Sequence, residues 1–108
     1  MRRCILVDSR ITTDKKTNEE VMYLTLCKLA SKTSNGNIYH PKKEDMFVIT
    51  AINKTKKPEE FELFKTVYPG ALIDLDYQLS SFDNKPYIAR KEVVPGTNIN
   101  TPEKLYLN

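Results

Sequence analysis

Residues 69–95, PGALIDLDYQLSSFDNKPYIARKEVVP, form the stretch that decides the predicted fold. Its first half alternates apolar and polar side chains, which is the pattern of a half-buried antiparallel strand. Its second half alternates less clearly, but its Tyr, Ile and Val content favours a second strand. The polar segment 82–85 separates the two halves, and Pro-Gly pairs flank them. We therefore predict a β-hairpin whose first strand places Ala71, Ile73, Leu75, Tyr77 and Leu79 on one face and Asp74, Asp76, Gln78 and Ser80 on the other, with Leu72 as the exception.

The chain before this hairpin supplies three further strands. Apolar runs over residues 3–12, 21–30 and 46–52 predict these strands, and the polar turn between the first two makes them a long hairpin. Residues 31–45 are rich in Ser, Thr, Asn and Gly and contain Pro41, so we predict a loop there. A loop of this length in a compact domain is often functional.

Residues 58–68 contain the one predicted helix. Pro58 suits the first turn, and the acidic side chains that follow favour the positive end of the helix dipole. The Pro69-Gly70 pair stops the helix. Its apolar residues recur at spacings of three and four, so they form one stripe that can pack against a sheet; they are Phe61, Leu63, Phe64, Val67 and Tyr68.

The composition is that of an ordinary soluble domain. A chain of 108 residues, 40% hydrophobic and 29% charged, suits one domain with a single modest core. The N-terminal sequence MRRCILVDSR has neither the long apolar region nor the cleavage site of a signal peptide, and no apolar run is long enough to span a membrane, so we expect a cytoplasmic protein. The net charge of +3 permits nucleic-acid binding without establishing it.

The sequence contains no recognisable catalytic or metal-binding constellation. His40 is the only histidine, and no nucleophile stands at a defined spacing from it. Cys4 and Cys27 lie in apolar runs without a CxxC motif, so we interpret them as small buried hydrophobes. Asp74 and Asp76 could hold a cation or act as acid and base, but paired carboxylates on a strand are more often its solvated face. We therefore predict a non-enzymatic protein without cofactor or metal.

The predicted order of elements is strand, strand, strand, helix, strand, strand. This order matches the OB-fold, a five-stranded Greek-key barrel, here with one short helix between strands three and four. We expect a mostly β OB-fold domain over residues 1–95 and a C-terminal tail over residues 96–108, either extended or flexible. At the level of element order, residues 3–94 resemble the small OB-fold single-stranded DNA-binding proteins of phages and conjugative plasmids. Bacterial housekeeping members end in an acidic tail that recruits partners, whereas this chain ends in TPEKLYLN, so the resemblance does not extend to that role.

The resemblance implies sequence-tolerant binding of single-stranded DNA by basic loops and stacking aromatic rings. In an OB-fold the second and third strands form the binding face, and the first and last hairpin loops flank it. Applied to this chain, the predicted binding residues are Tyr23, Lys28 and Phe47 on the strands, Tyr39 and Lys43 in the long loop, and Lys85, Tyr87 and Arg90 on the last hairpin. We expect Lys15, Lys16, Lys42 and Lys91 to add positive charge nearby, and the face with Asp74 and Asp76 to avoid DNA.

Several alternatives stay open at this stage. Tyr23 and Phe47 lie in apolar runs, so each is equally compatible with the core. The loop lysines can be simple solvated charges. The same barrel could be a protein-interaction subunit of a larger complex or could bind RNA instead of DNA. A homo-oligomer and contacts with replication or conjugation proteins would fit the DNA-binding interpretation, and no membrane partner is expected.

Overall fold

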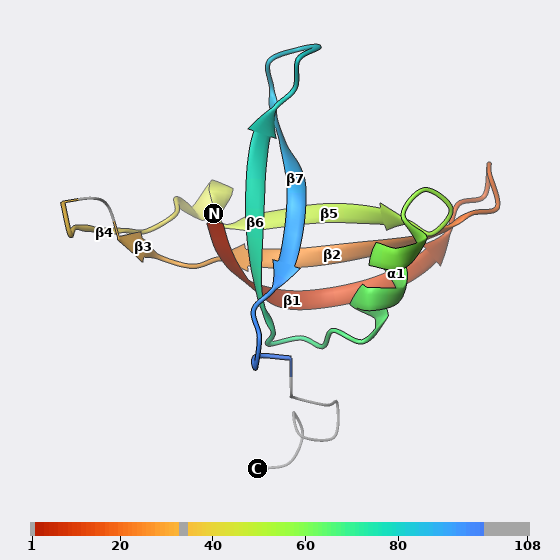
Figure 1. The fold of residues 1–108 in the computed structure, drawn as a ribbon, viewed down its shortest axis with the longest axis horizontal. Coiled ribbons are helices and arrows are strands. Elements are labelled where there is room, and N and C mark those ends of the chain that lie inside the picture. The colour runs from red at the N-terminus through yellow and green to blue at the C-terminus, as the bar shows by residue number, and fades with distance from the viewer. Residues whose placement is uncertain (1, 33–34, 99–108) are drawn as a thin grey trace.

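The computed structural model describes residues 2–32 and 35–98, and these residues form the mostly β fold that the sequence predicts. Five strands make one antiparallel sheet in the order β5-β2-β1-β6-β7 (Figure 1). The strands are β1 (Arg2–Thr13), β2 (Glu20–Lys28), β5 (Phe47–Asn53), β6 (Leu72–Leu79) and β7 (Pro86–Val93), and the α-helix is α1 (Pro58–Lys65).

The sheet does not close into the predicted barrel. Strands β5 and β7 are the two edges of the sheet and are not paired with each other in the described part of the chain. Strands β6 and β7 instead cross the layer of β1, β2 and β5, and their far ends extend past β5 (Figure 1). Because β7 crosses β5 rather than lying alongside it, the two edges have no common length over which to pair.

The long loop over residues 31–45 is more ordered than predicted. It contains a two-stranded hairpin of β3 (Ser31–Lys32) and β4 (Ile38–Tyr39) and the 3-10 helix η1 (Lys43–Asp45). The predicted position of the helix between strands three and four is therefore wrong in chain order, because α1 lies between β5 and β6.

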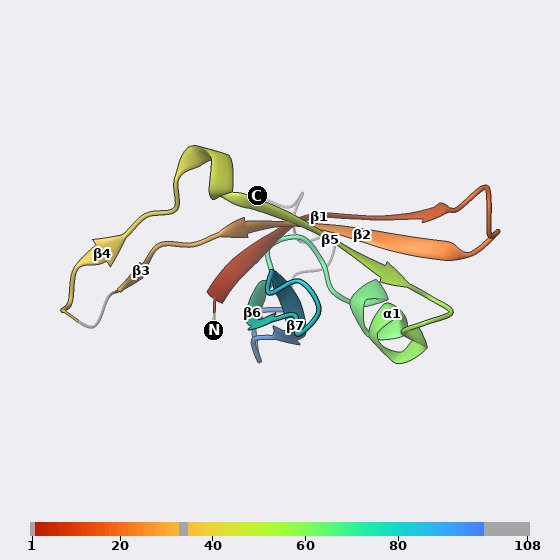
Figure 2. The ribbon, with the colours of Figure 1, turned by 90° about the horizontal axis from the view of Figure 1, so that it is seen from above.

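Strand β1 connects the two parts of the sheet. Residues 2–5 pair with β6, and residues 4–13 pair with β2. Figure 2 shows β6, β7 and α1 on one side of the layer formed by β1, β2 and β5. The core fills the space between them and consists of Cys4, Leu6, Met22, Leu24, Leu26, Ile52, Phe61, Phe64, Val67, Ala71, Ile73 and Leu75.

A β-bulge explains why the second half of the deciding hairpin alternates poorly in sequence. Asp76 pairs with Arg90 and Tyr77 with Ile88, so Ala89 is an extra residue in β7. The bulge turns Ile88 to the same side as Val93, and both pack against the core. Strict alternation along the sequence would have placed these two side chains on opposite faces.

The two longest hairpins close with the same kind of turn. Asp14 N–H donates to Glu19 O and Asn18 N–H donates to Asp14 O, at 2.8 and 2.7 Å. Ser80 and Asn84 repeat this pattern at the β6–β7 turn. Asn18 and Asn84 have φ of 58° and 55°, and asparagine tolerates this left-handed backbone better than most residues.

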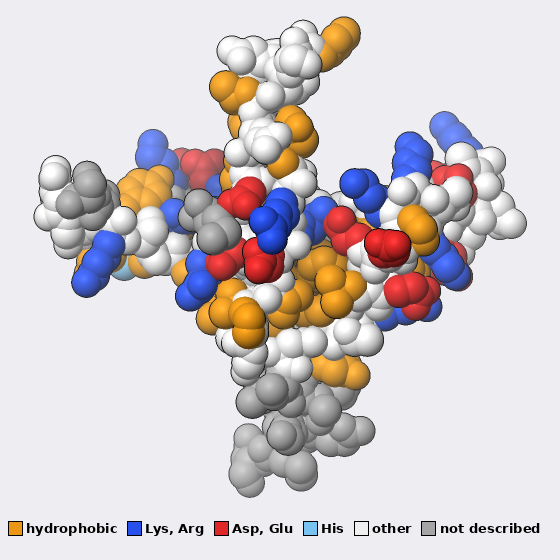
Figure 3. All heavy atoms as spheres, in the orientation of Figure 1, with side chains coloured by type: hydrophobic (Ala, Val, Ile, Leu, Met, Phe, Trp, Pro, Cys, Tyr) orange, Lys and Arg blue, Asp and Glu red, His pale blue; other side chains and the backbone are white. Residues whose placement is uncertain are grey.

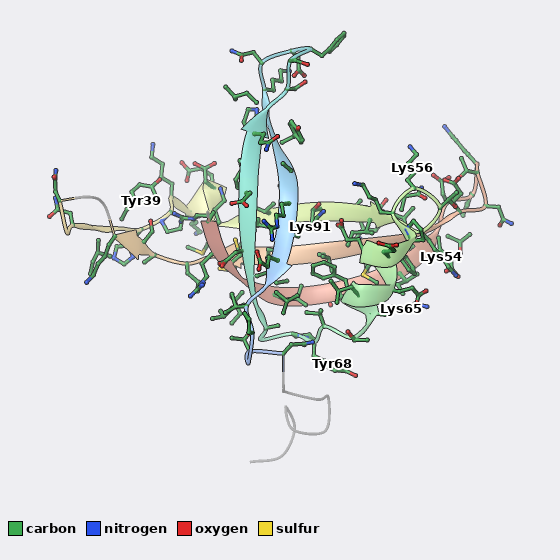
Figure 4. The ribbon with its side chains drawn as sticks, viewed as in Figure 1. Tyr39, Lys54, Lys56, Lys65, Tyr68 and Lys91 are labelled. Carbon is green, nitrogen blue, oxygen red and sulfur yellow. The ribbon has the colours of Figure 1, made fainter. Side chains whose placement is uncertain are left out.

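Helix α1 is shorter than predicted but has the expected buried face. Phe61 and Phe64 are buried, and Pro58 occupies the first turn. Leu63 was also expected in the apolar stripe, but it is 52% exposed because it points away from the sheet. The ammonium of Lys91 on β7 donates to Glu60 Oε1 at 2.6 Å, and this ion pair joins the helix to the hairpin (Figure 4).

The predicted tail, residues 96–108, lies mostly outside the described residues. The part that is described is tied to the end of the helix region. Thr97 Oγ1 accepts a hydrogen bond from Leu72 N–H at 3.1 Å, and Asn98 Oδ1 accepts one from Tyr68 N–H at 3.0 Å. None of the helices in the described ranges is long and apolar enough to cross a membrane.

Candidate nucleic-acid interface

The layer of β5, β2 and β1 has one face that no described helix or strand covers (Figure 2). The strand register aligns its side chains in rows, because paired residues of antiparallel strands share a face. One row is Arg10, Tyr23 and Ala51, and the next is Asp8, Thr25 and Ile49. We call this surface the open face; it is formed by Ile5, Asp8, Arg10, Tyr23, Thr25, Cys27, Phe47, Ile49 and Ala51.

Tyr23 and Phe47 lie on the open face and not in the core. Met22 is buried, and successive side chains of a strand point to opposite faces, so Tyr23 lies on the open face. Phe47 pairs with Cys27 on the same face and is 56% exposed. The guanidinium of Arg10 lies over the Tyr23 ring, 5.8 Å from its centroid. The Phe47 ring is therefore exposed, and the Tyr23 ring is partly exposed beneath Arg10.

Lysines gather at the Tyr23 end of this layer. The β1–β2 turn contains Lys15 and Lys16, and the neighbouring β5–α1 loop contains Lys54, Lys56 and Lys57. Figure 4 labels Lys54 and Lys56 in this loop. The two loops lie together, since Lys54 N–H donates to Glu20 O at 3.0 Å. The Lys54 ammonium also pairs with the Glu20 carboxylate at 3.3 Å.

Lys28 and Tyr39 belong to a second group. They line a pocket of about 250 Å³ together with Arg2, Pro41, Asp45 and Tyr77. Lys28 pairs with Cys4 and Arg2 pairs with Leu75, so both are on the inner side of the strands, opposite Tyr23. Lys43 is exposed in the short helix η1 beside this pocket.

Lys85 and Tyr87 form a third group at the tip of the β6–β7 hairpin. They line a shallow pocket of about 370 Å³ with Ser80, Asp83 and Pro86. Phe82 at the turn is 96% exposed. The predicted binding residues are thus divided among the open face, the Arg2 pocket, the hairpin tip and, for Arg90, the outer side of β7.

The outer side of β6 and β7 has balanced charge. Arg90 Nη2 lies 3.1 Å from Glu92 Oε2, and Arg3 donates two hydrogen bonds to Asp74. Figure 3 shows acidic and basic side chains side by side over this surface. The positive charge of Arg90 is therefore offset locally. Lys91, which we expected near the ligand, points to the other side and is only 11% exposed in its pair with Glu60.

The ion pair of Arg3 and Asp74 gives a prediction on pH. The two Arg3 hydrogen bonds hold the pKa of Asp74 below its ordinary value. A lowered pKa in the folded state contributes stability above the unfolded value of about 4, and this contribution is lost as the pH falls through the folded value. Asp74→Asn should therefore lower Tm at neutral pH, and the difference from wild type should shrink below about pH 4.

The matched control is Asp8→Asn, because Asp8 is exposed on the same sheet and forms no ion pair with another described residue. Thermal unfolding followed by circular dichroism across the pH range measures both variants. A Tm difference for Asp74→Asn that stays constant down to the acid limit would contradict the role of the ionised carboxylate.

The chemistry of the cysteines favours packing over catalysis. Cys4 is buried and Cys27 is partly buried, and both are free thiols. Burial raises the pKa of the Cys4 thiol, so it stays protonated and unreactive at neutral pH. Cys4 pairs with Lys28 and Cys27 with Ile5, which places the two thiols on opposite faces. Among residues 2–32 and 35–98, no three metal-binding side chains gather at one place.

Sequence reasoning missed four residues that contribute to these surfaces: Arg2, Arg10, Ile49 and Tyr77. Arg10 pairs directly with Tyr23. Deriving the register of the predicted hairpin of the first two strands would therefore have identified Arg10. Arg2 and Tyr77 meet only because β1 pairs with β6 across more than seventy residues of sequence. No local pattern signals that contact.

Comparison of the chain with protein-family models, with characterised proteins and with solved structures finds no match.

Proposed function

We propose that this protein binds single-stranded DNA with little sequence preference, mainly on the open face. The observation that supports this most is the pair of aromatic rings on an uncovered sheet face: Phe47, which is exposed, and Tyr23, which is partly exposed with Arg10 over it. Strand spacing puts their Cα atoms roughly 14 Å apart. A flexible strand can therefore stack separate bases on the two rings, and each stack is worth roughly 1–3 kcal/mol.

The strand order supports an OB-like interpretation of this face. If β3 and β4 are treated as an insertion in the long loop, the remaining strands follow the OB order, and α1 follows the third of them. Strands two and three of an OB-fold, here β2 and β5, form its binding face, and the fold is often partly open. The open edges of β5 and β7 are compatible with that description.

The cations supply the second requirement of a strand-binding surface. Arg10 lies on the open face, and the β1–β2 turn at the Tyr23 end of that face carries Lys15 and Lys16. The β5–α1 loop leads to the inner side, where the Lys54 ammonium lies over the Phe61 ring (Figure 2). Positive groups beside stacking rings follow the phosphates of a bound strand. No cofactor takes part in this mechanism. A homo-oligomer would extend the contact along the strand, and this remains a prediction, as do replication or conjugation partners and a cytoplasmic location.

Binding should be visible in the tyrosine fluorescence, because the chain has six Tyr and no Trp. A poly-dT oligomer should quench this emission at low salt. The logarithm of the association constant should then fall linearly with the logarithm of the salt concentration, by about 0.7 for each phosphate contact. The same titration with duplex DNA tests the preference for single strands, and the titration with poly-U tests the preference for DNA over RNA. Absence of any binding to poly-dT at low salt would disprove the proposed function.

A protein partner is the second candidate function. Ile49 is 70% exposed beside Phe47, and both lie on β5, an edge strand. An exposed apolar edge strand can accept a strand from another chain. A stoichiometric protein that stays bound after nuclease treatment, together with no affinity for poly-dT, would favour this second function.

A further inference from the structure

Arg2 lines the pocket of about 250 Å³, and two nitrogen atoms of its guanidinium group lack hydrogen-bond partners among the described residues. The Nη1 atom of Arg2 donates to Ser31 Oγ at 3.1 Å, and its guanidinium lies 5.6 Å from the centre of the Tyr39 ring. The Nε and Nη2 atoms are buried and have no hydrogen-bond partner among the described residues. Buried donors without a partner are rare and costly, so this edge has the character of a site for a missing acceptor.

Arg3, the next residue, shows what such an edge accepts. Its Nε and Nη2 atoms donate to the two carboxylate oxygens of Asp74, at 2.9 and 3.1 Å. This is the side-on, two-bond arrangement by which arginine binds carboxylates and phosphates. The same two atoms of Arg2 have no hydrogen-bond partner among the described residues. Arg2 and Arg3 thus have the same pair of donor atoms. Those of Arg3 bond a carboxylate, and those of Arg2 bond no described residue.

The surroundings of Arg2 favour an anion. Lys28 adds a second positive charge to the pocket, and Asp45 is the one carboxylate that lines it. Ser31 and Tyr39 hold the guanidinium in place, which reduces the entropy that binding would cost. Burial raises the pKa of Tyr77, so its phenol stays protonated and can donate a hydrogen bond to an anion.

We propose that this pocket binds a phosphate group of the nucleic-acid strand, with Arg2 as its two-bond donor and Lys28 as its second cation; this assignment rests on the proposed function. The strand would pass from the open face around the Phe47 end of the layer, because Lys28 follows Cys27, the partner of Phe47. A phosphate bound side-on by Arg2 through two oxygens has further oxygens, and further negative charge, for Lys28, whereas a carboxylate has only the two oxygens that already bond Arg2. The pocket, at about 250 Å³, matches part of a nucleotide rather than a whole cofactor, because sites for drug-sized ligands occupy about 300–1,000 Å³. The rings of Tyr39 and Tyr77 can contact the attached sugar or base.

The direct test observes the Arg2 side chain by NMR of the isotope-labelled full chain. Thymidine 5′-monophosphate should shift the Nε–H signal of Arg2, and thymidine without the phosphate should not. The Nε–H signal of Arg3 is the internal control and should stay in place, since Asp74 already occupies it. A shift of the Arg2 signal by a glutamate-rich peptide, with none by the nucleotide, would overturn the phosphate assignment.

Two variants link the pocket to strand binding. Arg2→Lys keeps the charge but loses the two-bond geometry, so it should weaken poly-dT binding about tenfold with an unchanged salt dependence. Arg2→Gln should also reduce the slope of the salt dependence by about 0.7. Arg3→Lys is the matched control and should keep wild-type affinity. Circular dichroism verifies that each variant is folded.

The outcomes separate this inference from the proposed function. The phosphate pocket is overturned if both Arg2 variants bind poly-dT like the wild type and the nucleotide does not shift the Arg2 signal. The open face then stays as the binding site. Failure of the wild type to bind poly-dT disproves the proposed function, and the phosphate assignment falls with it. Reduced affinity in both Arg2 variants, with the expected difference in salt slope, supports the pocket.

Discussion

Replacing Tyr23 and Phe47 together by alanine should nearly abolish binding of poly-dT while the protein stays folded. Each base stacked on an aromatic ring contributes roughly 1–3 kcal/mol. The two positions lie on separate strands, so their contributions should add approximately. Neither ring is part of the core, so the fold does not depend on them. Titration of the variant by fluorescence anisotropy of a labelled oligomer measures the loss.

The controls separate stacking from other effects at the open face. Tyr23→Phe keeps the ring and should bind like the wild type. Leu63→Ala removes an exposed apolar side chain from the helix, on the other side of the sheet layer, and should also leave binding unchanged. Wild-type affinity in the Tyr23 and Phe47 double variant would show that the open face is not the DNA site. Loss of the folded state would contradict the placement of the two rings outside the core.

The five strands of the large sheet could be predicted from the sequence because each has a local signal, whereas the two-residue strands β3 and β4 have none. Period-two alternation around residues 71–79 identified β6, and apolar runs identified β1, β2 and β5. The closure of the sheet had no such signal. Whether β5 and β7 pair depends on the direction in which the β6–β7 hairpin crosses the layer, and this follows from the short β1–β6 ladder over residues 2–5. No single stretch of the sequence determines this long-range geometry.

The candidate site was predictable to a similar extent. Residue type and element order selected Tyr23 and Phe47, and alternation restricted Tyr23 to the face opposite Met22. The sequence could not reveal that Lys28 and Tyr39 lie on the other side of the strands from Tyr23. It also gave no reason to distinguish Arg2 from Arg3. That difference depends on Asp74, which lies beside one arginine and not the other.

The fold itself should depend most strongly on Phe61. This side chain is fully buried between α1 and the sheet, and the ammonium groups of Lys54 and Lys65 lie 5.8 and 5.4 Å from the centre of its ring (Figure 4). Phe61→Ala should reduce the free energy of unfolding by about 3–5 kcal/mol, because it loses the buried ring and leaves a cavity. A domain of this size has only about 5–15 kcal/mol in total, so the variant should be close to unfolding.

Leu63→Ala is the matched control, since it truncates an apolar residue of the same helix that is 52% exposed. Its effect should stay within about 0.5 kcal/mol. Chemical denaturation followed by circular dichroism measures both variants, and Phe61→Leu supplies an intermediate loss if the alanine variant does not fold. Equal losses for Phe61→Ala and Leu63→Ala would mean that α1 does not pack through one face. Without that face, the link between the helix and the inner side of the layer would depend on polar contacts such as the ion pair of Lys91 with Glu60.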